Sequence, residues 1–161
     1  MGIVKRSDKK AFYMIEGETV FNRMIGFTEI SKSMNPLEYT RKYVDCNMEE
    51  SDVVGYAPAL TISFDEHDGN PVHDDIKNIF DYEKTGNEAV RKIAIVDFTQ
   101  PVPGEEGAYF AKIRDYAVIP ESEGNGTEHY EYSATLKAKS EVLSGRATSN
   151  DGWYTISVDK M

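Results

Sequence analysis

Hydrophobic and polar residues alternate along much of the chain, as they do in a β-strand with one buried and one exposed face. In residues 130–139 (YEYSATLKAK), every second position is Tyr, Ala or Leu, and the positions between them are Glu, Ser, Thr or Lys. Residues 60–65 (LTISFD) repeat this alternation. Residues 91–98 (RKIAIVDF) have apolar side chains at both sets of positions, which predicts a central strand covered on both faces.

The same pattern predicts further strands, with turn-forming Gly, Pro, Asn and Asp residues between several of them. These predicted strands are residues 11–15, 20–28, 39–44, 108–120 (broken at Pro120) and 153–158. The chain has no internal repeat, low-complexity tract or linker. We therefore expect a single domain over residues 1–161.

One segment has a helical period instead. Its apolar residues, spaced i, i+4, i+7 and i+8 and so on one helix face, are Val72, Ile76, Ile79 and Phe80. Asn70 suits the N-cap, Pro71 suits the first helical position, and Gly86 suits the end of the helix. A helix is predicted over residues 71–84, which makes the protein mainly β with one α-helix.

Composition and charge exclude several classes of function. The chain carries a net charge of −10, so its overall charge repels nucleic acid and anionic membranes. No apolar run approaches the ~20 residues that a membrane-spanning helix needs. Cys46 is the only cysteine, so no intramolecular disulfide forms, which fits synthesis in a reducing cytoplasm. We expect its thiol to be buried and unreactive, because nothing near it in the sequence supplies an activating base.

The strongest candidate for metal or proton chemistry is the segment 65–76 (DEHDGNPVHDDI), which has five acids and two histidines. His67 and His73 are six positions apart across a strand–turn–helix boundary, unlike the i, i+4 pair of an HExxH zinc site. Ile76 stands where an EF-hand needs its last glutamate. Asp74 and Asp75 fall in the first turn of the predicted helix, where the helix dipole favours negative charge. We therefore predict no metal site.

Other catalytic motifs are also missing. The chain has no GxSxG elbow, Walker loop or GxGxxG. His129 lies among glutamates in a predicted hairpin region, which is typical of a surface residue. We predict that the protein is not an enzyme and uses no cofactor.

One long segment is more informative about function than the missing catalytic motifs. It combines charges of both signs with several tyrosines and covers residues 35–58 (NPLEYTRKYVDCNMEESDVVGYAP). A connection this long and this rich in charge is uncommon as a simple connector. It is interpreted either as a surface arm that contacts a partner or as a mobile, solvated loop.

Several segments, in consistent order from about Phe12 to Val158, resemble the major tail tube protein of long-tailed (siphovirus-type) bacteriophages of Gram-positive hosts. These segments are EYTRKYVD (38–45), DVVGYAP (52–58), GNPVHDDI (69–76), VRKIAIVDFTQP (90–101) and RDYAVIPESEGNGTEHYEYSATLKAKSE (114–141). The closest resemblance is to the tubes of flexible, non-contractile tails.

The resemblance implies two packed β-sheets, a β-sandwich flanked by a helix, and assembly into stacked hexameric rings. The inner sheet of each subunit would join its neighbours in a continuous β-barrel that lines a lumen through which DNA passes without specific binding. Residues 1–10 would form an N-terminal arm, and residues at about 31–54 would form a long inter-ring loop. The implied partners are the protein itself, a tail length-determining protein and tail tip and terminator proteins. The implied location is the virion, with assembly in the host cytoplasm and no membrane.

Two sets of residues are candidates for these roles. Contacts between subunits or rings are expected at Lys5, Arg6, Lys9, Lys10, Tyr39, Arg41, Tyr43, Glu49, Glu50 and Asp52. The basic N-terminal residues would meet the acidic ones of the next ring. Acids facing the lumen, which would repel the DNA backbone, are expected at Asp65, Asp115 and Glu131, because these residues lie on predicted strands.

Three alternatives stay open. The related tubes of contractile tails and phage-derived bacteriocins share the implied fold, and binding of a sheath protein would distinguish them. A monomeric β-sandwich binding module with a tyrosine-rich ligand face is a second alternative. A hydrolase with an active site assembled in space is a third.

Overall fold

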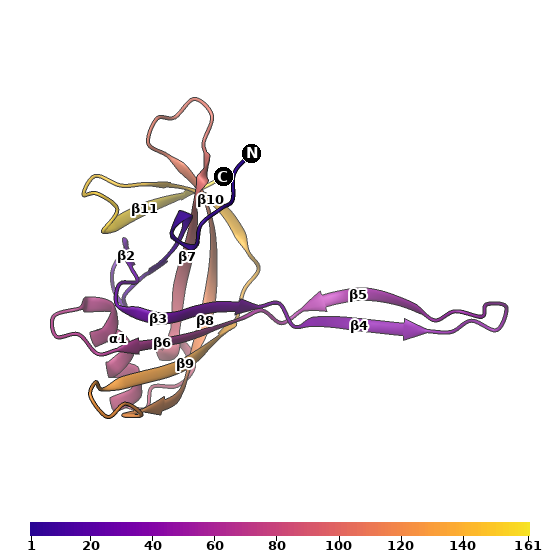
Figure 1. The fold of residues 1–161 in the computed structure, drawn as a ribbon, viewed down its shortest axis with the longest axis horizontal. Coiled ribbons are helices and arrows are strands. Elements are labelled where there is room, and N and C mark those ends of the chain that lie inside the picture. The colour runs from indigo at the N-terminus through magenta and orange to yellow at the C-terminus, as the bar shows by residue number, and fades with distance from the viewer.

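The structure is a computed structural model that describes all 161 residues, and it is mainly β with one α-helix, which confirms the predicted fold class (Figure 1). The elements are η1 (Arg6–Asp8), β1 (Lys9–Tyr13), β2 (Phe21–Arg23), β3 (Phe27–Ser33), β4 (Pro36–Arg41), β5 (Glu50–Tyr56), β6 (Ala59–Asp65), α1 (Pro71–Asp81), η2 (Gly86–Ala89), β7 (Val90–Pro101), β8 (Tyr109–Glu123), β9 (Glu131–Ala138), β10 (Leu143–Thr148) and β11 (Thr155–Lys160).

Nine of the strands belong to one continuous sheet, in the order β10-β11-β2-β1-β7-β8-β9-β6-β3. Strand β10 also pairs with the start of β8, so β8, β10, β11, β2, β1 and β7 close into a barrel. Every pairing in the sheet is antiparallel. The two expected layers are therefore two parts of one sheet: the closed barrel, and an extension formed by the end of β8 with β9, β6 and β3.

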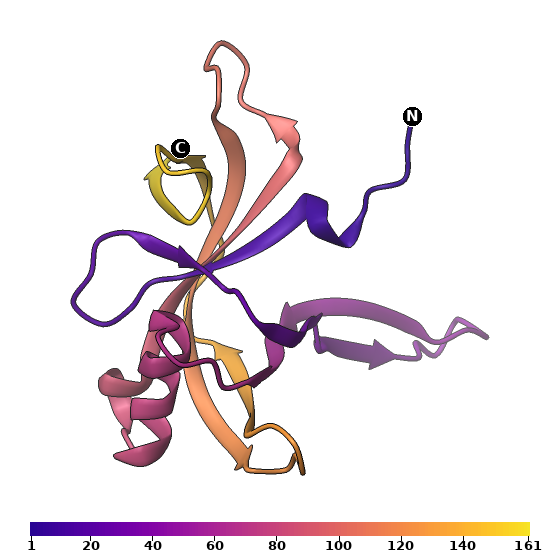
Figure 2. The same cartoon turned by 60° about the vertical axis from the view of Figure 1, so that its left-hand side comes forward.

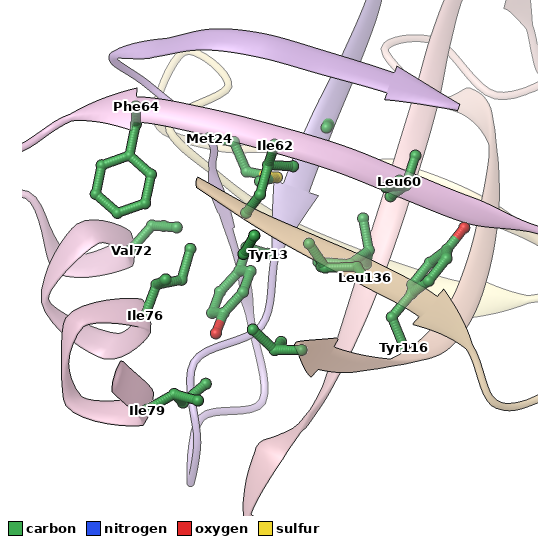
Figure 3. Close-up of a cluster of buried hydrophobic side chains, with 14 of the residues drawn as sticks. Tyr13, Met24, Leu60, Ile62, Phe64, Val72, Ile76, Ile79, Tyr116 and Leu136 are labelled. Carbon is green, nitrogen blue, oxygen red and sulfur yellow. The ribbon is translucent and has the colours of Figure 1, made fainter. Parts of the chain in front are cut away.

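Strands β1 and β7 form a wall between two hydrophobic cores. On one face of this wall, Phe12 and Ala94 pack inside the barrel with residues of β2, β8, β10 and β11. On the other face, Tyr13 and Ile93 pack against the extension and helix α1, as Figure 3 shows for Tyr13. The prediction that residues 91–98 form a central strand covered on both faces is confirmed.

Helix α1 begins where its sequence predicts. The Asn70 side chain accepts hydrogen bonds from the backbone N–H groups of Val72 (3.1 Å) and His73 (3.2 Å), which caps the helix. The buried side chains Val72, Ile76 and Ile79 point from one helix face into the core (Figure 3). Each such burial stabilises the fold by about 1.5–3 kcal/mol.

The predicted end of the helix is wrong. The helix ends at Asp81, not at residue 84, and Gly86 begins the short helix η2. Glu83 adopts a positive φ of 48°, so the chain leaves the helical path before it reaches the glycine.

Two predicted strands also differ from the structure. The segment 20–28 is interrupted at Gly26, which has φ +81° and lies so close to two histidine rings that a Cβ atom would be 3.0 Å from each. Strand β8 continues through Pro120 to Glu123, although the prediction broke it there. Proline is tolerated at this point because the end of β8 is an edge, and a β-bulge follows it.

A buried polar cluster attaches the helix to the wall. Arg91 of β7 donates from Nε to Asp75 of α1 (2.8 Å), and the hydroxyl of Tyr13 of β1 donates to the same carboxylate (2.5 Å). Burial, followed by the charge of Asp75, raises the pKa of Tyr13 well above its ordinary value, which keeps the hydroxyl protonated. The sequence explained Asp75 only by the helix dipole, whereas the structure shows it as the buried partner of Arg91.

Candidate assembly surfaces

The extension has one apolar face and one polar face. Its apolar face packs on the core through residues such as Ile62 and Leu136. Its polar face carries hydroxyl side chains in register across the strands, Ser31–Thr61–Thr135 in one row and Ser63–Ser133 in the next. The hydroxyls of Ser63 and Ser133 are 3.1 Å apart. The alternation read from residues 60–65 and 130–139 thus produces a sheet face covered by Ser and Thr.

This polar face is acidic. Its charged residues are Glu29, Asp65, Glu121, Glu131 and Lys137. Asp65 and Glu131 are directly opposite each other on β6 and β9, and neither has a cation within ion-pair distance. Like charges in such a position destabilise a sheet by up to about 1 kcal/mol. The fold itself therefore gives no reason for this pair of acids.

Of the three acids predicted to share one surface, the structure brings only two together. Asp65 and Glu131 are neighbours, whereas Asp115 lies nearer the barrel and forms an ion pair with Lys92 (3.1 Å). Glu29 and Glu121 lie on the polar face but were missed. Both residues lie just beyond the end of a predicted strand. Glu29 follows the segment predicted over residues 20–28, and Glu121 follows Pro120, where the predicted strand 108–120 ended.

The extension is open at both edges. Strand β3 pairs only with β6, so its outer backbone groups have no neighbouring strand. At the opposite edge, β7 accompanies β8 only as far as Ala117, and the residues of β8 beyond it pair with β9 alone. Open edges are templates for pairing with another chain.

The segment predicted as a long loop is a β-hairpin. Strands β4 and β5 form a separate two-stranded sheet that projects far from the body (Figures 1 and 2). It leaves the body between β3 and β6, where the Asn35 side chain donates to the carbonyl of Ala57 (3.0 Å). Thr40 and Ser51 pair across it (3.0 Å). An extended hairpin forms here because residues 36–41 and 50–56 are rich in β-branched and aromatic side chains.

The hairpin and its turn hold six of the predicted contact residues, all of them exposed. Tyr39 and Arg41 stack on each other on β4, with the guanidinium 5.0 Å from the ring centroid. Glu50 and Asp52 lie on β5, and Glu49 just precedes it. Tyr43 lies in the turn region, beside the only cysteine. Cys46 is exposed at this tip, so its expected burial is wrong.

The basic N-terminal residues are divided between an extended segment and a strand. Lys5 and Arg6 belong to the exposed segment that precedes β1, and Arg6 donates to the carbonyl of Ile30 on β3 (3.1 Å). Lys9 and Lys10 already lie in β1, paired with Asp97 and Val96 of β7. The arm predicted over residues 1–10 is therefore shorter, because β1 begins at Lys9. None of these cations contacts the acids of the hairpin within the chain.

The two histidines of the acidic segment 65–76 are packing residues. His73 is fully buried, stacks on Phe64 (4.2 Å between ring centroids) and accepts from the backbone N–H of His67 at Nδ1 (3.1 Å). Burial, followed by the nearby His67, lowers the pKa of His73 to about 4. No three His, Cys, Asp or Glu side chains are grouped so that they would hold a metal ion. Helix α1 is also too short to cross a membrane.

Among solved structures, several chains are similar to this one. No family model matches the chain, and no curated protein matches it. A chain in the cryo-EM structure of the anti-feeding prophage (AFP) baseplate, 6-fold symmetrised, is similar with a TM-score of 0.49 and 6% sequence identity. The similarity covers 89% of this chain and 95% of that chain.

Proposed function

We propose that the protein is the structural subunit of a bacteriophage tail tube and self-assembles into stacked hexameric rings around a conduit for DNA. One observation carries the proposal: the extension is a four-stranded sheet that is polar on one face and open at both edges. The serial resemblance of the sequence to tail tube proteins supports the same function. In this role the protein needs no active site and no cofactor.

The strand directions suit closure into a ring. The end of β8, β9, β6 and β3 alternate in direction, so β3 runs opposite to β8. When identical subunits are placed side by side by rotation, β3 of one subunit meets β8 of the next in antiparallel orientation. A head-to-tail interface that closes by rotation gives a cyclic oligomer. Such a ring removes both open edges and forms one continuous antiparallel barrel.

The polar face is suited to a conduit wall. Duplex DNA carries about one phosphate charge per 1.7 Å of its axis, and a basic wall would hold it through counterion release. The unpaired acids Asp65 and Glu131 repel phosphate instead. The neighbouring hydroxyl groups are neutral and hydrophilic, so they offer no charge that would hold DNA. Lys137 is the one base among the charged residues of this face.

The hairpin and the N-terminal segment are suited to contacts between rings. Both extend from the same side of the body in Figure 2. The hairpin buries none of its apolar side chains within its own chain. A tail length-determining protein and tail tip and terminator proteins would start and stop stacking. The assembled protein would belong to the virion.

The first test is negative-stain electron microscopy of the purified protein at low and then high concentration, repeated with phage lysate as a source of initiating complexes. We expect rings or hollow tubes of uniform diameter. Scattered monomers under all conditions would contradict the proposal and favour a monomeric binding module. Binding of a sheath protein to the tubes would assign them to a contractile tail or bacteriocin.

A second test asks whether the polar face of the extension lines the conduit, in variants that still assemble. The double variant Asp65→Lys, Glu131→Lys reverses the charge of the polar face without altering the apolar face or the edges. We expect it to form tubes that retain DNA, with retention falling as salt is raised. The isosteric variant Asp65→Asn, Glu131→Gln is the control and should retain much less. Equal DNA retention by all three proteins would show that this face does not line the conduit.

A further inference from the structure

A cluster of cations without anionic partners lies between the extension and the barrel. Lys32 is on β3, and Lys112 and Arg114 are on β8. No ion pair of the chain includes any of the three, although the chain has ten more acids than bases. Partial burial, followed by the charges of Arg114 and Lys112, lowers the pKa of Lys32. The cluster is therefore a site of uncompensated positive charge.

The cluster borders a groove. Lys32 and Lys112 line a cavity of about 440 Å³ together with Lys9, Ile95 and Asp97. Asp97 forms an ion pair with Lys9 (3.8 Å), so Lys32 and Lys112 are the cations of this lining without an anionic partner. Arg114, two residues further along β8, lines a separate pocket, and its Nε atom is buried without a hydrogen-bond acceptor. An unpaired buried donor is costly, so an acceptor from another molecule would stabilise it.

The ligand that fits such a groove combines carboxylates with apolar side chains. The tip of the hairpin, residues 43–52, has this chemistry, with four acids and no base. It also exposes the apolar side chains of Tyr43, Val44 and Met48. The tip cannot reach the groove of its own chain, because the hairpin extends away from the body (Figure 1). A second copy can supply it.

We propose that the groove bordered by Lys32, Lys112 and Arg114 is the receptor for the hairpin tip of another copy, whose Glu49 and Glu50 pair with these cations. The proposal rests on the tube function and adds the place where the hairpin binds. Lys5 and Arg6 of the N-terminal segment line a neighbouring pocket that shares Lys9, Lys32 and Ile95 with this groove, and they add positive charge beside it.

A charge-swap experiment tests the pairing. Lys32→Glu with Lys112→Glu, and separately Glu49→Lys with Glu50→Lys, place like charges opposite each other and should raise the concentration needed for tube formation at least about tenfold. Combining all four substitutions in one chain restores opposite charges and should recover most of the loss. Lys77→Glu with Lys84→Glu, which makes the same change of charge on and just after helix α1, is the control and should assemble normally. Circular dichroism checks that each variant is folded.

A cross-link tests the location. Cys46 lies at the tip and is the only cysteine, and Ser144 is an exposed residue that lines the groove opposite Lys112. With Ser144→Cys, mild oxidation should join Cys46 of one copy to position 144 of another and give a ladder of oligomers on a denaturing gel. The same substitution combined with Cys46→Ser, and Thr127→Cys with Cys46 retained, should give no ladder.

The outcomes distinguish this inference from the function on which it rests. Wild-type tubes with unaffected charge variants and no cross-link would overturn the receptor and leave the tube function standing. A wild-type protein that never forms tubes would overturn the function, while the cross-link would still report binding of the tip in soluble oligomers. Normal assembly with loss of duplex DNA binding in the Lys32→Glu, Lys112→Glu variant would assign the cations to nucleic acid and overturn the proposal.

Discussion

The body of the molecule and its hairpin are both antiparallel β-structure, yet they use their side chains in opposite ways. In the body, β1 and β7 are covered on both faces, and helix α1 covers much of the second core. In the hairpin, β4 and β5 have no buried residue on either face. A two-stranded hairpin alone is marginally stable in water. The contrast indicates that the body supplies the free energy of folding and that the hairpin contributes little to it.

The largest loss of stability should follow from removing the carboxylate that connects helix and wall. Asp75→Ala leaves Arg91 and the Tyr13 hydroxyl buried without their partner, so we expect a loss of about 3–5 kcal/mol in the free energy of unfolding. Urea denaturation measures it. Asp74→Ala, in the exposed first turn of the same helix, is the control and should cost no more than about 1 kcal/mol. Equal losses would mean that the buried cluster does not hold the helix.

A leucine-to-alanine substitution in each region tests whether the body, and not the hairpin, supplies the stability. Leu60 in β6 is 1% exposed and Leu37 in β4 is 53% exposed. We expect Leu60→Ala to cost about 2–5 kcal/mol, because it leaves a cavity in the core. Leu37→Ala should change the free energy of unfolding by no more than about 0.5 kcal/mol. A large loss from Leu37→Ala in the monomer would show that the hairpin contributes to folding.

Acid should destabilise the body through His73. Its pKa is about 4 in the folded protein, against about 6.5 when unfolded, so the unfolded chain binds the extra proton. This contribution is fully present above pH 6.5 and is lost as the pH falls from 6.5 to 4. The expected size is on the order of 3 kcal/mol.

The measurement compares the wild type with His73→Asn, whose side-chain oxygen can still accept from the backbone of His67. Unfolding free energies at several values of pH should fall less steeply for the variant. Identical slopes between pH 6.5 and 4 would show that His73 does not carry this dependence, and the acids would have to account for it.

The smallest effect on folding should come from removing the hairpin. Asn35 and Ala57 are adjacent at its base and hydrogen-bonded to each other, so two glycines can replace residues 36–56. We expect the free energy of unfolding of the monomer to change by less than about 1 kcal/mol, because no side chain of β4 or β5 is buried. Assembly into stacked rings should be lost. A shortened protein that is much less stable, or that still forms long tubes, would contradict the division of roles.

Sequence patterns predicted the body better than the surfaces. Alternation identified β6 and β9, a run of apolar residues identified β7, and Asn70 and Pro71 marked the start of α1, because these signals are local. The pairing of Asp75 with Arg91 joins positions 16 residues apart and leaves no local pattern. The cluster of Lys32, Lys112 and Arg114 was missed for the same reason. In the hairpin, the sequence predicted one strand at residues 39–44, shifted from β4 (Pro36–Arg41), and missed β5, since exposure on both faces weakens the alternation that identifies a strand.

The closure of the barrel has a consequence for the order of synthesis. Strand β2, near the start of the chain, pairs with β11, near residue 155, so the ring of strands closes only after the last strand has been made. Contacts of such long sequence separation slow folding. A nascent chain that stops before β11 leaves Phe21 and Phe12 without the Ile156 that covers them. The barrel therefore closes only in copies that include β11, and a chain cut before it cannot complete this core.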